Sequence, residues 1–424
     1  MKAVVGLLAA IVVVVHAKVQ EGKCGYYGFA VWRVTPLDKV GLDLLVDWFK
    51  NDRDGTDFWM PPNDLNHTVD MQIAPEVMSD VRKALEAANV KIDVLFDDLA
   101  RAILKEKVQN PSLTRTTKAT FKFSKYHQVD EILQWLDVIA PTCSNGLNCN
   151  VQIIGQSFEG RDMKLIKLNT GTSSGKKAIW IDCGIHAREW VSPATCVYMI
   201  NRFIDDYSRG YSEAVQALND YDWYILPSSN PDGYAYTWSN NRMWRKTRST
   251  NSGSSCVGTD PNRNWGYFWM YAGASSNPCS DIYGGSKAFS ESETKAMSDF
   301  ILTIPNLKAY ISIHSYSQMI LTPWGYASNL PADYTELLRV GNAAATELRS
   351  LYDTRYQVGS STALLYAAAG ASDDWAKGTA GAKYSYTYEL RDTGSYGFIL
   401  PASQILSTAK ETYESIKKMS AEFV

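Results

Sequence analysis

Two histidines in the C-terminal part of the chain end apolar segments that are predicted to be strands. His186 ends the segment 176–186 and is followed three residues later by Glu189, and His314 lies near the end of the segment 307–315. The carboxyl ends of strands in an α/β sheet are where ligand sites form. Two imidazoles and one carboxylate are the ligand set of a catalytic zinc ion, with a fourth position left for water. The alternative interpretation is a strand-end histidine beside a surface glutamate.

A base for such a site is offered by the predicted strand 382–390. Alternation places Ser385, Thr387 and Glu389 on one face, opposite three tyrosines. A carboxylate at this strand end could accept the proton of a water molecule that a metal activates. The alternative is a surface ion pair between Glu389 and Arg391.

Cationic candidates lie in NRMWRKTR, which holds Arg245, and in DPNRNW, which holds Arg263. Peptide hydrolysis develops an oxyanion, and an exopeptidase must also hold a free carboxylate. Arginine suits both tasks because it is always charged and binds carboxylates bidentately. Taken alone, scattered arginines such as these are usually solvated surface.

The elements that must position these side chains divide the chain into two parts. Residues 18 to about 115 predict a small α+β module with an antiparallel sheet, in the order strand 26–34, helix 39–50, hairpin 54–74, helix 76–90 and strand 91–96. A polar segment, 108–120, follows, and an exposed Arg115 there would be a site of proteolysis. Residues 116–424 alternate strands with helices, which predicts an α/β domain with a mostly parallel or mixed sheet.

Two local motifs carry further predictions. Residues 171–175 match G-x-S-x-G, but a nucleophile elbow joins a strand to a helix, and both flanks here are predicted strands. We therefore interpret this motif as a turn and reject a serine hydrolase. Ser290 and Glu293 are spaced as a capping box for the helix 290–304.

Composition and the N-terminus indicate the compartment. The 424 residues include 42 basic and 45 acidic side chains, a balance that argues against a nucleic-acid partner. Residues 1–17 are typical of a secretory signal peptide, with a buried apolar N-terminus as the alternative. No later stretch approaches the ~20 apolar residues of a membrane span. We expect a secreted, extracellular monomer with no membrane partner.

Secretion would let the seven cysteines form disulfides. Cys143 with Cys149, Cys183 with Cys196, and Cys256 with Cys279 are the pairs that neighbour each other in sequence, which leaves Cys24 odd. Spacing alone does not fix this connectivity.

Several segments together make the chain resemble the zinc metallocarboxypeptidases of the pancreatic A/B type, namely HAREW, NRMWRKTRS, DPNRNW, SIHSYSQ and ELRDTGSYGFILPASQI. The resemblance covers essentially the whole chain. It implies a mixed, mainly parallel eight-stranded sheet flanked by helices, preceded by a small α+β antiparallel prodomain. The implied order is signal peptide 1–17, activation segment 18–115 and catalytic domain 116–424.

The resemblance also implies roles for individual residues. His186, Glu189 and His314 would hold one zinc ion, Glu389 would be the general base, and Arg245 would polarise the carbonyl and stabilise the oxyanion. Asn262, Arg263 and Tyr366 would hold the C-terminal carboxylate of the substrate, Arg188 would serve a neighbouring subsite, and Asp260 would orient a zinc-bound histidine. Cys256–Cys279 would match a disulfide common in the family, and Cys183–Cys196 one seen in B-type members.

Specificity depends on Asp373, which stands at the pocket-floor position where B-type enzymes resemble each other in having Asp. A buried carboxylate there would favour a C-terminal Lys or Arg. Two departures leave the width of the pocket open: Gly325 stands where B-type pockets have Ser, and the segment 376–385 is one residue longer than usual. Asp57 resembles the acidic prosegment residue that occupies the carboxylate-binding arginine, so we expect it to face Arg263. A plain surface Asp is the alternative.

These features predict a secreted zymogen that a trypsin-like protease cuts near Arg115 and that its own prosegment inhibits. The mature enzyme would remove C-terminal Lys or Arg from peptides and proteins with a free C-terminus. One alternative is A-type or broad specificity. Another is a catalytically silent protein that binds peptide C-termini, although the presence of all three ligand candidates and Glu389 argues against it.

Overall fold

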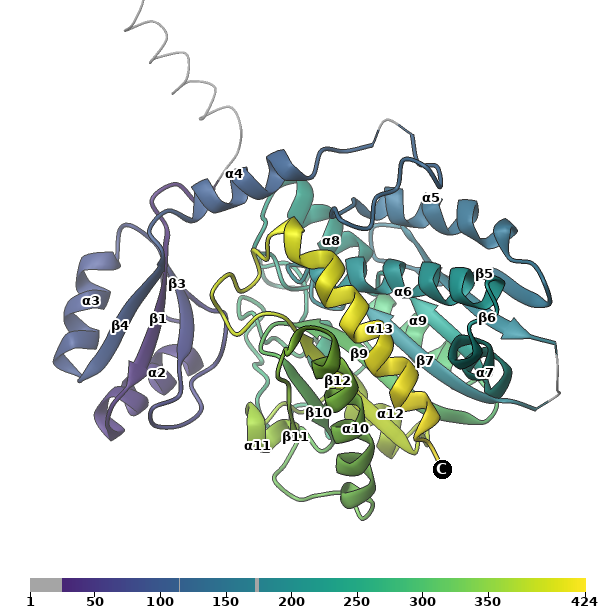
Figure 1. Cartoon of the computed structure of the whole chain (residues 1–424). Helices are drawn as coiled ribbons and strands as arrows, with labels where there is room; N and C mark the ends of the chain where they lie inside the picture. Colours follow the sequence, from purple (N-terminus) through teal and green to yellow (C-terminus); the bar gives the residue numbers. More distant parts are fainter. Residues whose placement is uncertain (1–24, 114, 172–174) are drawn as a thin grey trace, which may run out of the picture. The chain divides into compact units, whose positions relative to one another are not determined.

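The computed structural model describes residues 25–113, 115–171 and 175–424 (Figure 1). They form two compact units: residues up to Val108 with Ser239–Arg242, and Gln109–Trp238 with Met243–Val424. The predicted signal peptide, Cys24 and the centre of the predicted turn 171–175 lie outside the described residues. Within the described ranges, no helix combines the length and the apolar character needed to cross a membrane.

The first unit is an antiparallel sheet covered by helices. Its strand order is β2-β3-β1-β4. Its elements are β1 (Ala30–Pro36), α2 (Lys39–Lys50), β2 (Thr56–Phe58), β3 (Val69–Ile73), α3 (Met78–Ala87), β4 (Val90–Phe96) and α4 (Leu99–Gln109), the last of which ends at the boundary of the unit. Leu45 and Trp48 of α2 and Leu85 of α3 pack on Trp32 and Met71 of the sheet. The predicted small α+β antiparallel module is confirmed.

One buried ion pair joins α4 to the segment 239–242 inside this first unit. The Arg242 guanidinium donates from Nε to one oxygen of Glu106 at 2.6 Å and from Nη2 to the other at 3.0 Å. Burial raises the pKa of Glu106, against the pull of the Arg242 charge. This segment, distant in sequence, therefore belongs to the core of the unit.

The second unit is built on an eight-stranded sheet of order β11-β10-β12-β9-β7-β8-β6-β5. The strands are β5 (Leu147–Gln156), β6 (Asp162–Thr170), β7 (Lys177–Cys183), β8 (Tyr221–Leu226), β9 (Leu307–Ser315), β10 (Met319–Thr322), β11 (Gln357–Ser360) and β12 (Tyr384–Leu390). β7 is parallel to β8 and β9, β9 to β12, and β10 to β11, whereas the other pairs are antiparallel. The predicted mixed, mainly parallel sheet is confirmed.

Helices cover both faces of this sheet. They are α5 (Val129–Ile139), α6 (Val191–Ser208), α7 (Ser212–Asp220), α8 (Pro231–Ser239), α9 (Ser292–Ile301), α10 (Tyr334–Tyr352), α11 (Ser361–Leu364), α12 (Ser372–Gly378) and α13 (Ile405–Ala421), with short 3₁₀ turns η1 (Ala140–Thr142), η2 (Pro261–Arg263) and η3 (Ala402–Gln404). Helices α5, α6, α10 and α13 pack on one face, and α9 and α12 on the other. Figure 1 shows α6 and α13 across the same face of the sheet.

Alternate side chains of β7 enter two different cores, one on each face of the sheet. Ile179 and Ile181 enter the core under α5 and α6, whereas Ala178 and Trp180 enter the core under α9. Central parallel strands covered on both faces are apolar throughout for this reason. The carboxyl ends of β7, β9 and β12 are thereby held rigidly next to each other.

The predicted capping box of α9 is wrong. The N-cap residue is Glu291, without a side-chain capping bond. The Glu293 carboxylate instead accepts the backbone N–H of Phe158, in the turn between β5 and β6, at 3.2 Å. Tertiary contact with a neighbouring turn therefore replaces the local cap.

Candidate metal centre and active site

Three of the predicted site residues meet at the carboxyl ends of two neighbouring strands. His186 follows β7, and Glu189 lies in the turn that precedes α6. His314 is the second-last residue of β9. β7 and β9 are parallel partners, with Cys183 opposite Ile313. All three site side chains are buried.

The donor atoms of these residues converge on one point. Nδ1 of His186 lies 2.7 Å from Oε1 of Glu189 and 3.2 Å from Nδ1 of His314, and His314 Nδ1 lies 3.2 Å from Oε2 of Glu189. Two buried imidazole nitrogens that face each other need a shared cation or proton, and a carboxylate beside them supplies charge balance. This donor set fits a zinc ion.

The protonation chemistry of His186 and Glu189 suits metal binding. For His314, burial acts to lower the pKa, but the charge of Glu189 raises it to about 9, so a bound cation would displace a proton there. Burial, and then the positive charge of Arg245, lower the pKa of His186, which favours its neutral, ligating form. Burial acts to raise the pKa of Glu189, but the two histidines outweigh it and lower that pKa. The glutamate is therefore held as a carboxylate.

Asp260 orients both His186 and Arg245. Its Oδ1 lies 3.1 Å from Nε2 of His186, and its Oδ2 accepts from Nε and Nη2 of Arg245 at 3.1 and 2.9 Å. Burial acts to raise the pKa of Asp260, but the charges of Arg245, His186 and Arg263 hold it well below its ordinary value. A carboxylate on Nε2 leaves Nδ1 of His186 as the free ligand atom.

Glu389 stands beside the trio on β12, directly opposite His314 in the register with β9. Burial, opposed by the charge of His314, raises its pKa to about 8. The alternative ion pair with Arg391 is not formed, because Arg391 donates to Glu411 of α13 at 2.7 Å. Glu389 is therefore left to face the site.

The three candidates for carboxylate binding are also brought together. Arg263 is buried, and its Nη2 has no hydrogen-bond partner within the described ranges. Its Cζ lies 5.8 Å from the ring centre of Tyr366, a half-buried loop residue. Asn262 accepts the backbone N–H of Ser372 at 2.9 Å, which leaves its amide N–H₂ to point elsewhere. A buried guanidinium edge without a partner is what a ligand carboxylate would fill.

Arg188 is buried and packs against an aromatic side chain. Its guanidinium stacks at 4.4 Å from the ring centre of Phe398 and lies 3.5 Å from Asp281. Tyr316 contacts Phe398 edge-on at 5.0 Å. Sequence reasoning did not predict this packing of Phe398 and Tyr316 beside Arg188, although both aromatics occur in the quoted segments SIHSYSQ and ELRDTGSYGFILPASQI.

Asp373 lies in the first turn of α12 and is only 3% exposed. Burial raises its pKa, and no side chain among the described residues hydrogen-bonds its carboxylate. Both carboxylate oxygens of its neighbour Asp374 accept hydrogen bonds, from the backbone N–H groups of Gly325 and Tyr326 at 2.9 Å each. Sequence reasoning missed this role of Asp374, for which the only signal was the pair of adjacent acidic residues.

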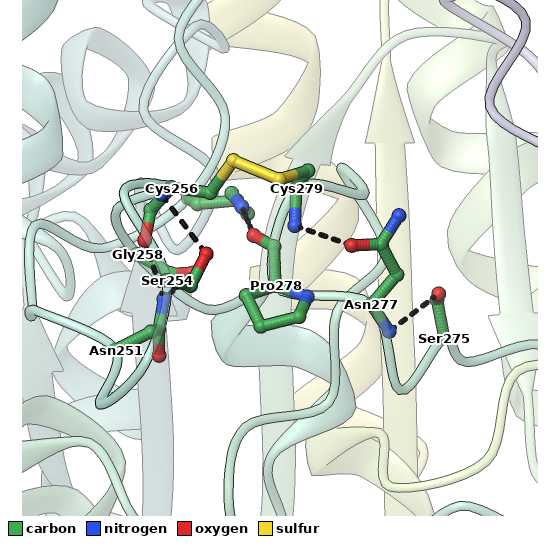
Figure 2. Close-up of a disulfide and its surroundings, with 9 residues drawn as sticks. Asn251, Ser254, Cys256, Gly258, Ser275, Asn277, Pro278 and Cys279 are labelled. Carbon is green, nitrogen blue, oxygen red and sulfur yellow. Dashed lines mark hydrogen bonds between the residues drawn. A yellow bond between two sulfur atoms is a disulfide. The ribbon is translucent and has the colours of Figure 1, made fainter.

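Among the described residues, three disulfides join segments of the second unit, and one of them restricts a segment that carries site residues. The structure pairs Cys143–Cys149, Cys183–Cys196 and Cys256–Cys279, the three pairs that the sequence favoured. Figure 2 shows Cys256–Cys279 joining two loops, each held by local side-chain bonds such as Asn251 to Cys256 O at 3.1 Å and Cys279 N to Asn277 at 3.0 Å. The first loop lies between Arg245 and Asp260 in sequence, so the disulfide restricts the segment that carries them.

The predicted cleavage residue Arg115 and one further histidine lie apart from this site. Arg115 is exposed and belongs to the second unit. His127, the third histidine of the main domain, is buried against the Phe121 ring at 3.8 Å and bonds Glu131 at 2.8 Å. It contributes to packing.

Comparisons with known proteins agree with this fold and donor set. A family model described as zinc carboxypeptidase matches residues 132–415, and one described as carboxypeptidase activation peptide matches residues 32–106. The chain is 49% identical over 304 residues to carboxypeptidase B of Astacus astacus, covering 71% of this chain and 98% of that protein. It is 42% identical over 396 residues to carboxypeptidase A2 of Mus musculus, covering 92% and 93%.

A solved structure of thrombin activatable fibrinolysis inhibitor (TAFI) superposes with a TM-score of 0.85 at 34% identity, covering 94% of this chain and 99% of that one. This chain therefore belongs to the zinc carboxypeptidase family. It is a zinc metallocarboxypeptidase zymogen with an activation peptide ahead of its peptidase domain.

Proposed function

We propose that the mature enzyme removes C-terminal Lys or Arg from peptides and proteins. The observation that carries this proposal is the buried carboxylate of Asp373, which has no side-chain hydrogen-bond partner among the described residues. Hydrogen bonds to this carboxylate within the described ranges come only from backbone N–H groups, and a second buried acid, Asp374, lies beside it. Ionising it there is costly, and a cationic side chain of the substrate would offset that cost. An apolar side chain would leave it in place.

The other site residues support an exopeptidase mechanism. Arg263, with Asn262 and Tyr366, would bind the free carboxylate and so select the last residue of the chain. Arg188 would serve the adjoining subsite. A zinc ion held by His186, Glu189 and His314 supplies a Lewis acid and lowers the pKa of water.

Glu389 and Arg245 would perform the residue-based chemistry. Glu389 would accept the proton of the attacking water and return it to the leaving amine. Arg245, held by Asp260, would donate hydrogen bonds to the carbonyl oxygen as its negative charge develops. Its fixed position means that little reorganisation is needed during the reaction.

We also propose that the chain is secreted as a monomer through the signal peptide 1–17. A trypsin-like protease would cut after Arg115, releasing the domain 116–424 from the inhibitory segment 18–115. The exposure of Arg115 supports access by such a protease.

The test is hydrolysis of two matched blocked dipeptides, ending in Arg or in Phe, by the trypsin-treated chain with and without a zinc chelator. We expect chelator-sensitive release of Arg far above Phe. Asp373→Asn should lower the Arg-to-Phe ratio roughly 100-fold, whereas Asp299→Asn, an exposed change in α9, should not alter it. A preference for Phe would indicate A-type specificity, and zinc binding without turnover would indicate a silent binding protein.

A further inference from the structure

The loop 267–273 packs against the segment that carries Tyr366. The backbone N–H of Ala369 donates to the Ala272 carbonyl at 2.8 Å, and the N–H of Trp265 donates to the Gly370 carbonyl at 3.0 Å. The two segments are therefore joined on both sides of the contact. Displacement of one would be transmitted to the other.

Gly273 is the point of closest approach. Its φ of 62° lies in the left-handed region, and a Cβ built on it would lie 1.6 Å from the carbonyl oxygen of Ala367. That oxygen belongs to the backbone, so no rotamer change could relieve the clash. Any side chain at position 273 would push Ala367, and with it the adjoining Tyr366.

The same residue also holds Arg263. The Gly273 carbonyl accepts the Nε–H of the Arg263 guanidinium at 2.7 Å. Arg263 Nη1 is held by its neighbour Asn262 through the backbone carbonyl at 2.8 Å, whereas Nη2 has no partner among the described residues. The Gly273 carbonyl therefore sets the direction in which the open edge of Arg263 points.

We propose that Gly273 is a positioning residue that aligns Arg263 and the Tyr366 segment as one binding site for the substrate's terminal carboxylate. The inference rests on the proposed function, because it assigns Gly273 a task in carboxylate binding. The far side of the loop is fixed independently, since the rings of Phe268 and Tyr326 stack at 3.9 Å with an angle of 2°. With one side stacked in this way, a displacement at Gly273 is directed toward Ala367.

The matched pair of variants is Gly273→Ala and Gly253→Ala in the full chain, each activated with trypsin. Both glycines have positive φ, but an added Cβ at Gly253 meets nothing within 4 Å. Gly253→Ala thus carries the backbone strain without the clash. For hydrolysis of benzoyl-glycyl-arginine we expect Gly273→Ala to raise KM about tenfold with a smaller change in kcat, as for weakening one charged hydrogen bond.

A binding measurement separates this inference from the proposed function. The probe is a benzoyl-glycyl-arginine analogue whose scissile carbonyl is reduced to a methylene, compared with its C-terminal amide by titration calorimetry. The preference for the acid over the amide should fall about tenfold in Gly273→Ala and stay unchanged in Gly253→Ala. If the wild-type chain binds the acid preferentially but hydrolyses nothing, the proposed function fails while the inference stands.

The inference is overturned if Gly273→Ala folds and keeps the acid preference of the wild type. If Gly273→Ala does not fold, Phe268→Ala replaces it, because Phe268 is 46% exposed. Its removal deletes the stacked contact between the loop and Tyr326, leaving the edge contacts of Tyr267 and Tyr271. An acid preference reduced in that variant supports the positioning role, and an unchanged preference overturns it.

Discussion

Glu389 and His314 are direct register partners on the parallel strands β12 and β9. The pairing fixes a carboxylate and an imidazole at the same level of the sheet, with backbone hydrogen bonds rather than flexible loops setting their separation. The two residues are therefore held in a precise relative position although they lie far apart in the sequence. The site gains its rigidity from the sheet, which is where precise constellations are best held.

Glu389→Gln tests the proposed base. The amide keeps the size of the side chain but cannot accept a proton, so kcat should fall by roughly 10²- to 10⁴-fold. Zinc content, measured by metal analysis after activation, should stay unchanged. Glu213→Gln, an exposed change in α7, is the control and should keep full activity. A variant of Glu389 with wild-type kcat would remove this residue from the mechanism.

Asp260→Asn tests the orienting carboxylate. Asn keeps the shape but loses the charge that Nε2 of His186 and the Arg245 guanidinium share. Zinc affinity should weaken by roughly 10- to 100-fold, as read by competition with a chromogenic chelator. The same competition with Asp299→Asn should reproduce the wild type. Equal zinc affinity in both variants would show that Asp260 serves only Arg245.

Much of the site could be predicted from the sequence because its ligands follow strong strand signals. His186 and His314 lie at or near the ends of apolar runs that predict strands, and parallel strands bring their carboxyl ends together. The period-two pattern likewise placed Glu389 on the face away from Tyr384, Tyr386 and Tyr388, and these tyrosines are buried in the core. The period-two pattern of a strand thus predicts reliably which face of the sheet each side chain lies on.

Contacts made by loop backbones could not be predicted in this way. Gly273 accepts the Arg263 N–H through its backbone carbonyl, and Asp374 accepts backbone N–H groups. In each of these contacts one partner is a backbone atom, which leaves no trace in the pattern of side chains along the sequence. The failed capping box has the same cause. Ser290 and Glu293 have the right local spacing, but the Phe158 N–H, distant in sequence, binds Glu293 instead.

Asp57→Ala tests inhibition by the activation segment, which the sequence predicts through a carboxylate facing Arg263. Loss of that carboxylate should raise the activity of the uncut chain on an Arg-terminated dipeptide, without changing the activity after trypsin treatment. Asp54→Ala, three residues earlier in the same segment, is the control. Latency equal to that of the wild type would leave Asp57 as a surface residue.

The Glu106–Arg242 pair allows a test of stability in the first unit. Glu106→Ala leaves a buried guanidinium without its carboxylate and should lower the free energy of unfolding by about 3–5 kcal/mol. Glu86→Ala removes an exposed carboxylate 3.7 Å from Arg82 and should cost less than about 1 kcal/mol. Chemical denaturation of the uncut chain measures both. The double variant Glu106→Leu/Arg242→Met should recover most of the loss, because it removes both buried charges.

Glu293 predicts how the stability of the second unit depends on pH. Burial, with smaller contributions from the charges of Glu291 and Asp232, raises its pKa to about 7 from an ordinary 4.5. Its Oε2 is buried without a hydrogen-bond partner among the described residues. The folded chain therefore favours the protonated acid, so Glu293 costs no stability below about pH 4.5. The cost grows as the pH rises from about 4.5 to 7 and levels off at about 3 kcal/mol above that range.

Glu293→Gln should remove this dependence, because the amide oxygen can still accept the Phe158 N–H and carries no charge at any pH. The variant should match the wild type near pH 5 and exceed its unfolding midpoint near pH 8, with the difference developing between these values. Thermal unfolding at a series of pH values provides the measurement. Asp299→Asn, which removes an exposed carboxylate 2.5 Å from Lys295, should show no such divergence. A Glu293→Gln curve parallel to the wild type from pH 5 to 8 would mean that the buried acid is already ionised at low pH, and that the neighbouring turn solvates its charge.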